Sequence, residues 1–322
     1  MALIYSSDKK DDDIIKVEKK YESFLKEWNL NKMINSKDLC LEFDVFFFDC
    51  DGVLWHGNEL IKGSIEVINY LLREGKKVYF ITNNSTKSRA SFLEKFHKLG
   101  FTNVKREHII CTAYAVTKYL YDKEEYRLRK KKIYVIGEKG ICDELDASNL
   151  DWLGGSNDND KKIILKDDLE IIVDKNIGAV VVGIDFNINY YKIQYAQLCI
   201  NELNAEFIAT NKDATGNFTS KQKWAGTGAI VSSIEAVSLK KPLVVGKPNV
   251  YMIENVLKDL NIHHSKVVMI GDRLETDIHF AKNCNIKSIL VSTGVTNANI
   301  YLNHNSLNIH PDYFMKSISE LL

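Results

Sequence analysis

A short run of aromatic residues that ends in two aspartates constrains this chain more than any other stretch. Residues 46–55 read FFFDCDGVLW. The apolar start is typical of a strand buried on both faces of a parallel sheet. Asp49, Asp51 and Gly52 do not suit such a strand unless it leaves the sheet there and opens onto a ligand-binding crevice. Because side chains alternate along a strand, Asp49 and Asp51 can point to one side while Cys50 points to the other.

The two carboxylates need compensation for their charge. Neighbouring carboxylates repel each other, which raises the pKa of one of them unless a cation or a bound proton relieves the repulsion. Taken alone, Asp49 and Asp51 are as consistent with a structural capping and turn pair, since Asp-Gly is a turn signal, as with a functional site. Partners for these charges elsewhere in the chain would favour a functional site instead.

The segments that follow predict alternating strands and helices. A helix is expected from about Ser64 to Glu74, and VYFIT (78–82) is a second buried strand. Near the C-terminus, KVVMIGD (266–272) and KSILVSTG (287–294) are further strands with helices between them. This order is typical of a parallel sheet covered by helices.

The middle of the chain has a strand and helix pattern of its own, with KKIYVIG, GAVVVGI and EFIAT as strands. We therefore expect a second α/β module inserted into the first. Residues 1–40 contain an amphipathic pattern and are expected to form a helical extension. The predicted division is an extension at 1–40, a catalytic core at 41–112 and 243–322, and an inserted cap domain at 113–242.

Composition excludes several classes of protein. The 322 residues carry 43 basic and 43 acidic side chains, so no net field favours nucleic acid or an anionic membrane. No apolar run approaches the roughly 20 residues that span a bilayer, and the N-terminus lacks the hydrophobic region of a signal peptide. The six cysteines are scattered without a CxxC pair, which argues against disulfides or a zinc site and favours the cytoplasm.

Four of the predicted strands end in polar side chains. The carboxyl ends of parallel strands line one crevice, so residues far apart in the sequence can converge there. These residues are Asp49 with Asp51, Thr82 with Asn83, Lys247, and Asp272 with Asp277.

This set of side chains suits the transfer and hydrolysis of a phosphoryl group. Carboxylates bind hydrated Mg²⁺, and a lysine together with helix N-terminal N–H groups binds phosphate. Once its charge is compensated, Asp49 can attack phosphorus and form an aspartyl-phosphate. Asp51 can protonate the leaving oxygen and then deprotonate the attacking water.

The same residues resemble the four motifs of the haloacid dehalogenase (HAD) superfamily. The amino-acid sequences of these motifs are similar to those in one branch of the superfamily, which contains p-nitrophenylphosphatases, phosphoglycolate phosphatases and pyridoxal phosphatases. The likeness runs from about residue 43 to the C-terminus and implies an α/β fold, with a Rossmann-like core, a central parallel sheet and an inserted α/β cap. The motifs are DCDGVLW (49–55), TNNS (82–85), VGKP (245–248) and GDRLETD (271–277).

The resemblance implies a role for each motif residue. Asp49 would be the nucleophile and a Mg²⁺ ligand. Asp51 would be the general acid and base, and its backbone carbonyl would be a second ligand. Asp272 would be the third protein ligand, and Asp277 would support either the water shell of the metal or Lys247.

The phosphate would be held by the second and third motifs. Thr82 and the Asn83 amide would bind the transferred phosphoryl group, with Asn84 beside them. Lys247 would neutralise that group and orient Asp49. In the cap, Asn211 and Asp213 match the NxD element that approaches the active site, and the family pattern also implies a homodimer formed through the cap.

We therefore expect a Mg²⁺-dependent phosphatase that acts on a small phosphorylated metabolite and serves metabolite repair. The first choice is 2-phosphoglycolate, with 2-phospholactate and p-nitrophenyl phosphate as further substrates, and pyridoxal 5′-phosphate is the alternative. The cap loop departs most from the family, so the substrate stays open, as does regulation by oxidation of Cys50. A receiver-like signalling protein is disfavoured, because Asp51 and the inserted module do not fit one.

Overall fold

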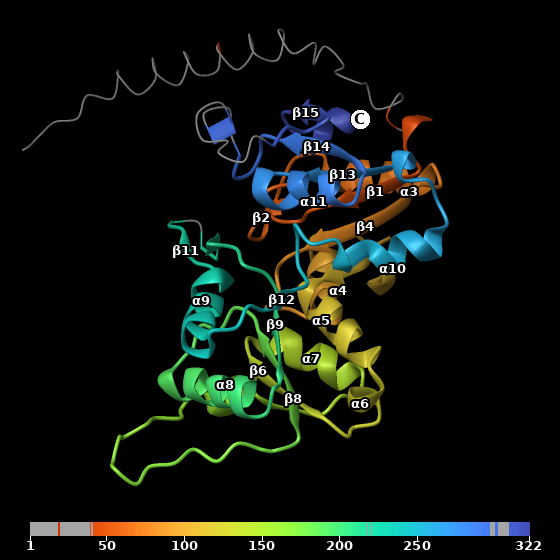
Figure 1. Ribbon diagram of the computed structural model, residues 1–322. Coiled ribbons are helices and arrows are strands. Elements are labelled where there is room, and N and C mark those ends of the chain that lie inside the picture. Colours follow the sequence, from red (N-terminus) through yellow and green to blue (C-terminus); the bar gives the residue numbers. More distant parts are fainter. Residues whose placement is uncertain are drawn as a thin grey trace, which may run out of the picture. The chain divides into compact units, whose positions relative to one another are not determined.

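A computed structural model describes residues 19, 39, 41–216, 218–219, 221–296, 300–301 and 309–322 (Figure 1). Apart from Lys19 and Leu39, the predicted helical extension lies outside the described residues. The chain divides into two compact units, residues 1–78 with 262–322 and residues 79–261. The predicted domain boundaries at 112/113 and 242/243 stay a prediction.

The first unit contains parallel strands in the order β15 (Tyr313–Met315), β14 (Lys287–Val291), β13 (Val267–Gly271) and β1 (Val45–Phe48). All four residues of β1 are buried. The predicted parallel strand is therefore present, and the aromatic run fills both of its faces.

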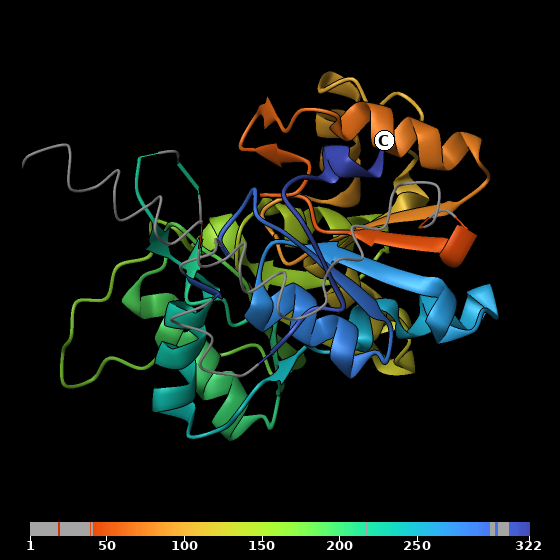
Figure 2. The ribbon, with the colours of Figure 1, turned by 90° about the horizontal axis from the view of Figure 1, so that it is seen from above.

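Helices lie on both sides of this group of strands. Figure 2 shows α3 (Ser64–Arg73) on one side and α11 (His279–Asn283) on the other. α3 buries Val67, Ile68 and Leu71, which lie at helical spacing. Further elements of this unit are the hairpin β2 (Trp55–His56) and β3 (Glu59–Leu60), the turns η3 (His264–Lys266) and η5 (Ile318–Leu321), and the π-helical turn η4 (Leu274–Ile278).

The second unit contains a five-stranded parallel sheet, in the order β12 (Leu243–Val244), β9 (Glu206–Ala209), β8 (Ile177–Val182), β6 (Lys132–Ile136) and β7 (Trp152–Gly154). Its helices α8 (Tyr190–Glu202) and α9 (Thr227–Ser238) pack on each other and on β8 (Figure 1). Here β12, from the segment predicted to return to the core, pairs with β9.

In addition to the five-stranded sheet, the second unit contains a pair of parallel strands. The chain enters the unit within β4 (Lys77–Thr82), which pairs with β5 (Ile109–Cys111). None of the described helices is both long and apolar enough to cross a membrane. The other elements of the unit are α4 (Arg89–Lys98), α5 (Thr112–Tyr121), α6 (Glu124–Arg127), α7 (Lys139–Ala147), α10 (Tyr251–Leu260), the turns η1 (Arg106–His108) and η2 (Gly155–Asp158), and the short strands β10 (Thr215–Gly216) and β11 (Trp224–Ala225).

Candidate active site

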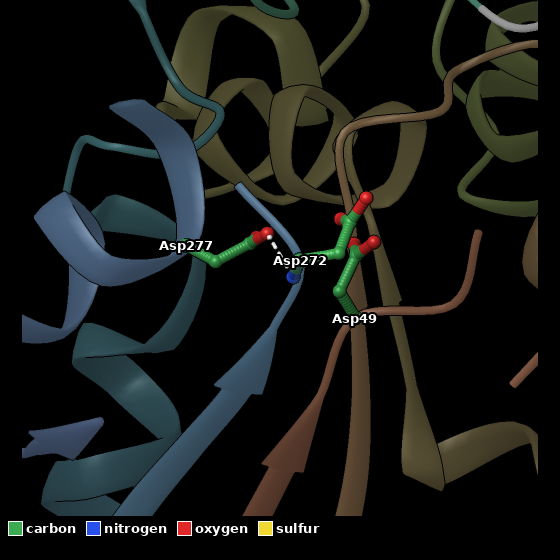
Figure 3. Close-up of side chains that lie close together, drawn as sticks. All are labelled: Asp49, Asp272 and Asp277. Carbon is green, nitrogen blue, oxygen red and sulfur yellow. Dashed lines mark hydrogen bonds between the residues drawn. The ribbon is translucent and has the colours of Figure 1, made fainter. Parts of the chain in front are cut away.

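Three aspartates gather at the carboxyl ends of two neighbouring strands of the first unit. Asp49 follows β1 and Asp272 follows β13, and Phe48 and Ile270 are paired in the register of these strands. Asp277 comes from η4. One carboxylate oxygen from each of the three lies within 4.8 Å of the others (Figure 3). Three carboxyl groups therefore converge at the carboxyl ends of these two strands.

Asp272 is held in place by the loop that follows β14. The backbone N–H of Val295 donates to Asp272 Oδ2 at 2.6 Å, and that of Thr296 donates to its backbone oxygen at 3.0 Å. Glycines let the chain come this close, since an added Cβ would lie 1.9 Å from Oδ2 at Gly294 and 2.6 Å from it at Gly52. Gly294 is not among the predicted site residues; its signal in the sequence is a Thr-Gly pair shortly after a buried strand.

Asp277 orders the backbone next to Asp272. Its Oδ2 accepts from the backbone N–H groups of Asp272, at 3.2 Å, and Arg273, at 3.0 Å. A Cβ at Gly271 would lie 2.2 Å from the Cβ of Asp277, so only glycine fits at that position without a shift. The spacing of the GDRLETD segment thus follows from one tight turn around a buried carboxylate.

This donor set fits a hard divalent cation. Mg²⁺ prefers oxygen ligands and is bound through a few carboxylates together with water. Three carboxylate oxygens this close also repel one another unless a cation compensates them. Asp49 and Asp272 were predicted as ligands, and Asp277, predicted to act indirectly, belongs to the same group of oxygens. The predicted contribution of the Asp51 backbone carbonyl stays a prediction.

Asp51 has a specific partner that the sequence did not indicate. The indole N–H of Trp55 donates to Asp51 Oδ1 at 3.0 Å. Trp55 is fully buried, whereas Asp51 is partly exposed. This contact could not be predicted, because nothing in a sequence indicates where an indole N–H will point.

In the second unit, the carboxamide of Asn83 joins three segments. Its Oδ1 accepts from the backbone N–H of Lys247 at 2.8 Å, and its Nδ2 donates to the Lys247 carbonyl at 3.0 Å. The same Nδ2 donates to Asp213 Oδ1 at 3.1 Å. The backbone carbonyl of Asn83 accepts from Asn211 Nδ2 and from Thr112 Oγ1, each at 2.8 Å. The side chain of Asn83 is thus used to connect protein segments.

The other phosphate-binding candidates lie around this connection. Thr82, buried at the end of β4, accepts at Oγ1 from the backbone N–H of Asn84 at 3.2 Å. Lys247 is 2% exposed, and its Nζ donates to the carbonyl of Ile81 at 2.8 Å. Asn84 Oδ1 accepts from the backbone N–H of Thr86 at 2.9 Å, which is the geometry of a turn.

The NxD element forms a compact turn of its own. Asn211 Oδ1 accepts from the backbone N–H of Asp213 at 3.0 Å, and the Asp213 carbonyl accepts from the N–H of Gly228 at 2.9 Å. A Cβ at Gly226 would lie 2.2 Å from that carbonyl oxygen. The GTG segment at 226–228 therefore serves to wrap closely around Asp213. The structure brings together Asn83, Asn211, Asp213 and Lys247.

Comparison with known proteins identifies the family of the chain. A family model described as haloacid dehalogenase-like hydrolase matches residues 46–151, and a second, HAD-hydrolase-like, matches residues 244–321. Phosphoglycolate phosphatase 2 of Arabidopsis thaliana is 42% identical over 289 residues, which cover 89% of this chain and 95% of the relative. The 4-nitrophenylphosphatase of Schizosaccharomyces pombe is 37% identical, with 88% and 95% covered.

A solved structure shows the same fold. The p-nitrophenyl phosphatase from Archaeoglobus fulgidus superposes with a TM-score of 0.74 at 25% identity, covering 87% of this chain and 98% of that one. Both the predicted α/β fold and the resemblance drawn from the motifs are confirmed. The chain therefore belongs to the haloacid dehalogenase-like hydrolases and is an enzyme of their phosphatase branch.

Proposed function

We propose that this protein is a Mg²⁺-dependent phosphatase of small metabolites with 2-phosphoglycolate as its first substrate. The observation that carries the proposal is the group formed by Asp49, Asp272 and Asp277, whose oxygens lie within 4.8 Å of one another at the ends of β1 and β13. The likeness to the Arabidopsis phosphoglycolate phosphatase, at 42% identity, supports the substrate.

The proposed reaction has two steps. In the first, a carboxylate oxygen of Asp49 attacks phosphorus, the bond from phosphorus to the leaving oxygen breaks, and Asp51 gives that oxygen a proton. In the second, water attacks the aspartyl-phosphate, Asp51 takes a proton from the water, and phosphate leaves as the Asp49 carboxylate is restored. Mg²⁺ bound by the aspartates would stabilise the negative charge that develops on the phosphoryl oxygens.

We further propose that the second and third motifs hold the phosphoryl group. Lys247 would place its positive charge beside the transferred group, and Thr82 and Asn83 would donate to its oxygens. The order and the sequences of the four motifs support the proposal that these residues bind the phosphoryl group together. The Asn83 carboxamide already bonds to Lys247 and Asp213, so we assign phosphate binding to the backbone N–H of Asn83.

The substrate is best decided by comparing kcat/KM across a panel of phosphate esters. The panel contains 2-phosphoglycolate, 2-phospholactate, glycerol 3-phosphate, pyridoxal 5′-phosphate and p-nitrophenyl phosphate. Glycerol 3-phosphate is included because the rat glycerol-3-phosphate phosphatase is 32% identical over 297 residues. A higher kcat/KM for pyridoxal 5′-phosphate or glycerol 3-phosphate than for 2-phosphoglycolate would contradict the proposed substrate.

The mechanism is tested separately with Asp49→Asn. This change removes the nucleophile, and we expect phosphate release to fall to background with every ester. Asp168→Asn is the matched control, because Asp168 is an exposed acid in a loop. Unchanged turnover in Asp49→Asn, or full activity in EDTA, would rule out the mechanism.

Assembly and location are also proposed from the family pattern. Two copies would associate through the cap segment 113–242, and the enzyme would work in the cytoplasm. Sedimentation velocity at micromolar protein concentration tests the first statement, and a purely monomeric profile would contradict it. Fractionation of the source cells tests the second.

A further inference from the structure

We propose that Trp55 is a positioning residue for Asp51. Its indole N–H would hold Oδ1 of the carboxyl group, so that Oδ2 is the oxygen that exchanges the proton with the substrate. The inference rests on the proposed function, in which Asp51 is the general acid and base. It adds a residue and an assignment of the two carboxyl oxygens.

The backbone places the indole firmly over Asp51. After Asp51 the chain turns at Gly52, where φ is +87°, and the N–H of Gly52 donates to the carbonyl of Trp55 at 2.8 Å. The N–H of Leu54 donates to the Cys50 carbonyl at 2.8 Å. Residues 51 and 55 thus lie side by side, as a parallel bridge between them also shows.

The following hairpin fixes the other side of Trp55. Trp55 pairs with Leu60 in the register of β2 and β3. The carbonyl of Leu54 accepts from the backbone N–H of Ile61 at 2.9 Å and from Ser64 Oγ at 3.0 Å. The turn is therefore tied to the start of α3, and the ring of Trp55 is 0% exposed. Trp55 is therefore fixed by backbone contacts on both sides of its position in the chain.

The indole N–H has one chemical function here. It is a donor and never an acceptor, and a buried donor without an acceptor is costly. Within the described parts of the chain, Asp51 Oδ1 receives this N–H at 3.0 Å, and Oδ2 accepts no hydrogen bond. The two oxygens of Asp51 are therefore distinct: one faces Trp55 and the other is available to substrate.

This difference decides where the proton of the acid form lies. In a protonated carboxyl group the carbonyl oxygen is a better hydrogen-bond acceptor than the hydroxyl oxygen, so the bond from the indole to Oδ1 favours the proton on Oδ2. From Oδ2 the proton passes to the leaving oxygen as the bond to phosphorus breaks. In the second step Oδ2 takes a proton from the attacking water, while the N–H of Trp55 still donates to Oδ1.

The test removes the indole N–H in two ways. Trp55→Phe removes the indole, and site-specific incorporation of 3-benzothienylalanine at position 55 replaces only N–H by sulfur. We compare kcat/KM for p-nitrophenyl phosphate with that for the best alkyl phosphate of the panel, because kcat/KM reports the steps up to departure of the leaving group. The leaving oxygen of an alkyl phosphate must be protonated as it departs, whereas p-nitrophenolate is a good leaving group and depends far less on a general acid.

The expected result is a dependence on the leaving group. Both variants should lose roughly 10- to 100-fold in kcat/KM for the alkyl phosphate, through kcat with KM little changed. The loss for p-nitrophenyl phosphate should be about threefold or less. Trp152→Phe is the matched control, because its indole N–H also donates to an aspartate, Asp146, at 2.7 Å and lies outside the proposed site. It should leave both values unchanged.

Three results would overturn the inference. Equal losses for both esters indicate that Trp55 only packs, and unchanged kcat/KM in the benzothienylalanine variant shows that the N–H is not used. If Asp51→Asn itself shows no dependence on the leaving group, the proposed role of Asp51 fails, and the inference fails with it.

A spectroscopic measurement tests the bond without turnover. The chain has four tryptophans, so ¹⁵N-labelled indoles give a simple spectrum in which Trp55→Phe identifies the signal of Trp55. Asp51→Ala should move that signal upfield, because the N–H loses its charged acceptor, while the other three stay in place. A Trp55 signal that does not move in Asp51→Ala would contradict the hydrogen bond.

Discussion

Asn83 and Asp213 are 130 residues apart in the sequence and are joined by a hydrogen bond of 3.1 Å between Nδ2 and Oδ1. The same carboxamide bonds to both the N–H and the carbonyl of Lys247, at 2.8 and 3.0 Å. Asn83 is 8% exposed, so water does not replace these partners easily. One side chain thus fixes the loops that follow β4, β9 and β12.

We predict that Asn83→Ala lowers both stability and activity. The substitution removes both hydrogen bonds between the Asn83 carboxamide and the backbone of Lys247, and truncating one partner of a buried hydrogen bond costs about 1–3 kcal/mol. The free energy of unfolding should fall by at least this amount in a urea titration. kcat should fall as well, because Lys247 loses its fixed position.

Lys212→Ala is the control for this variant. Lys212 lies between Asn211 and Asp213, but its Nζ is paired with Glu235 at 2.9 Å on the surface. Because the Lys212 side chain is 41% exposed, this pair contributes about 0–1 kcal/mol. Equal losses of stability in the two variants would contradict the prediction that the hydrogen bonds of Asn83 stabilise the protein more than the pair of Lys212 with Glu235 does.

A second prediction concerns Gly294. An added Cβ there would lie 1.9 Å from Asp272 Oδ2. The loop cannot easily move away, because the N–H of Val295 is bonded to that oxygen at 2.6 Å. Gly294→Ala should therefore displace the carboxylate of Asp272, and the Mg²⁺ concentration for half-maximal activity should rise at least tenfold.

The control for Gly294→Ala is a glycine whose replacement strains only the backbone. Gly75 has φ of +74°, and an added Cβ would meet nothing within 4 Å. Gly75→Ala should cost about 1–2 kcal/mol of stability from its left-handed conformation, with no change in Mg²⁺ dependence. A normal Mg²⁺ dependence in Gly294→Ala would show that the loop adapts.

The sequence predicted those parts of the site that depend on short spacing. Asp49 directly follows an apolar run, and Asp272 and Asp277 share one turn. The local sequence pattern was therefore enough to predict these three residues. Trp55 and Gly294 were missed for a physical reason. An indole N–H and an absent Cβ become informative only when a turn or a distant loop brings them against a carboxylate.

Strand pairing shows the same limit. The apolar residues 243–244 predict a strand, but their pattern does not indicate which sheet they join. In the structure they pair with Ile208 and Ala209 of β9. The partner of a short strand depends on contacts far along the chain, and these are not encoded in the local alternation of residues.

We predict that a buried ion pair stabilises the second unit. Glu144 is 2% exposed and accepts from Arg89 Nη2 at 3.1 Å and from the Arg89 backbone N–H at 2.6 Å. The guanidinium also lies 3.5 Å from the ring centroid of Tyr114. Glu144→Ala leaves the Arg89 charge uncompensated, which should cost about 3–5 kcal/mol in a denaturant titration.

Glu124→Ala is the matched control for Glu144→Ala. Glu124 pairs with Lys130 at 3.9 Å, and both side chains are about two-thirds exposed. The cost should stay below about 1 kcal/mol. Similar costs for the two glutamates would contradict the importance of burial at Glu144.

The last prediction concerns four buried cysteines. Burial raises the pKa of Cys111, Cys142, Cys199 and Cys284 to about 12, from an ordinary value of 9.0. Since the thiolate is the reactive form, these thiols should resist iodoacetamide at pH 8 in the native protein. In urea they should react at the rate of free cysteine, as peptide mass spectrometry can show.

The pH dependence of this labelling distinguishes burial from simple blocking. In the unfolded chain, raising the pH from 8 to 9 increases the thiolate fraction several-fold, because the pKa is close to 9. In the folded chain the four thiols stay protonated at both pH values, so native labelling should follow the unfolded fraction and increase with urea below the transition. The folded state binds these protons more tightly, so their contribution to stability is full below pH 9 and is lost between pH 9 and about 12. Native labelling that rises with pH as in the unfolded chain, with no response to urea, would contradict the raised pKa values.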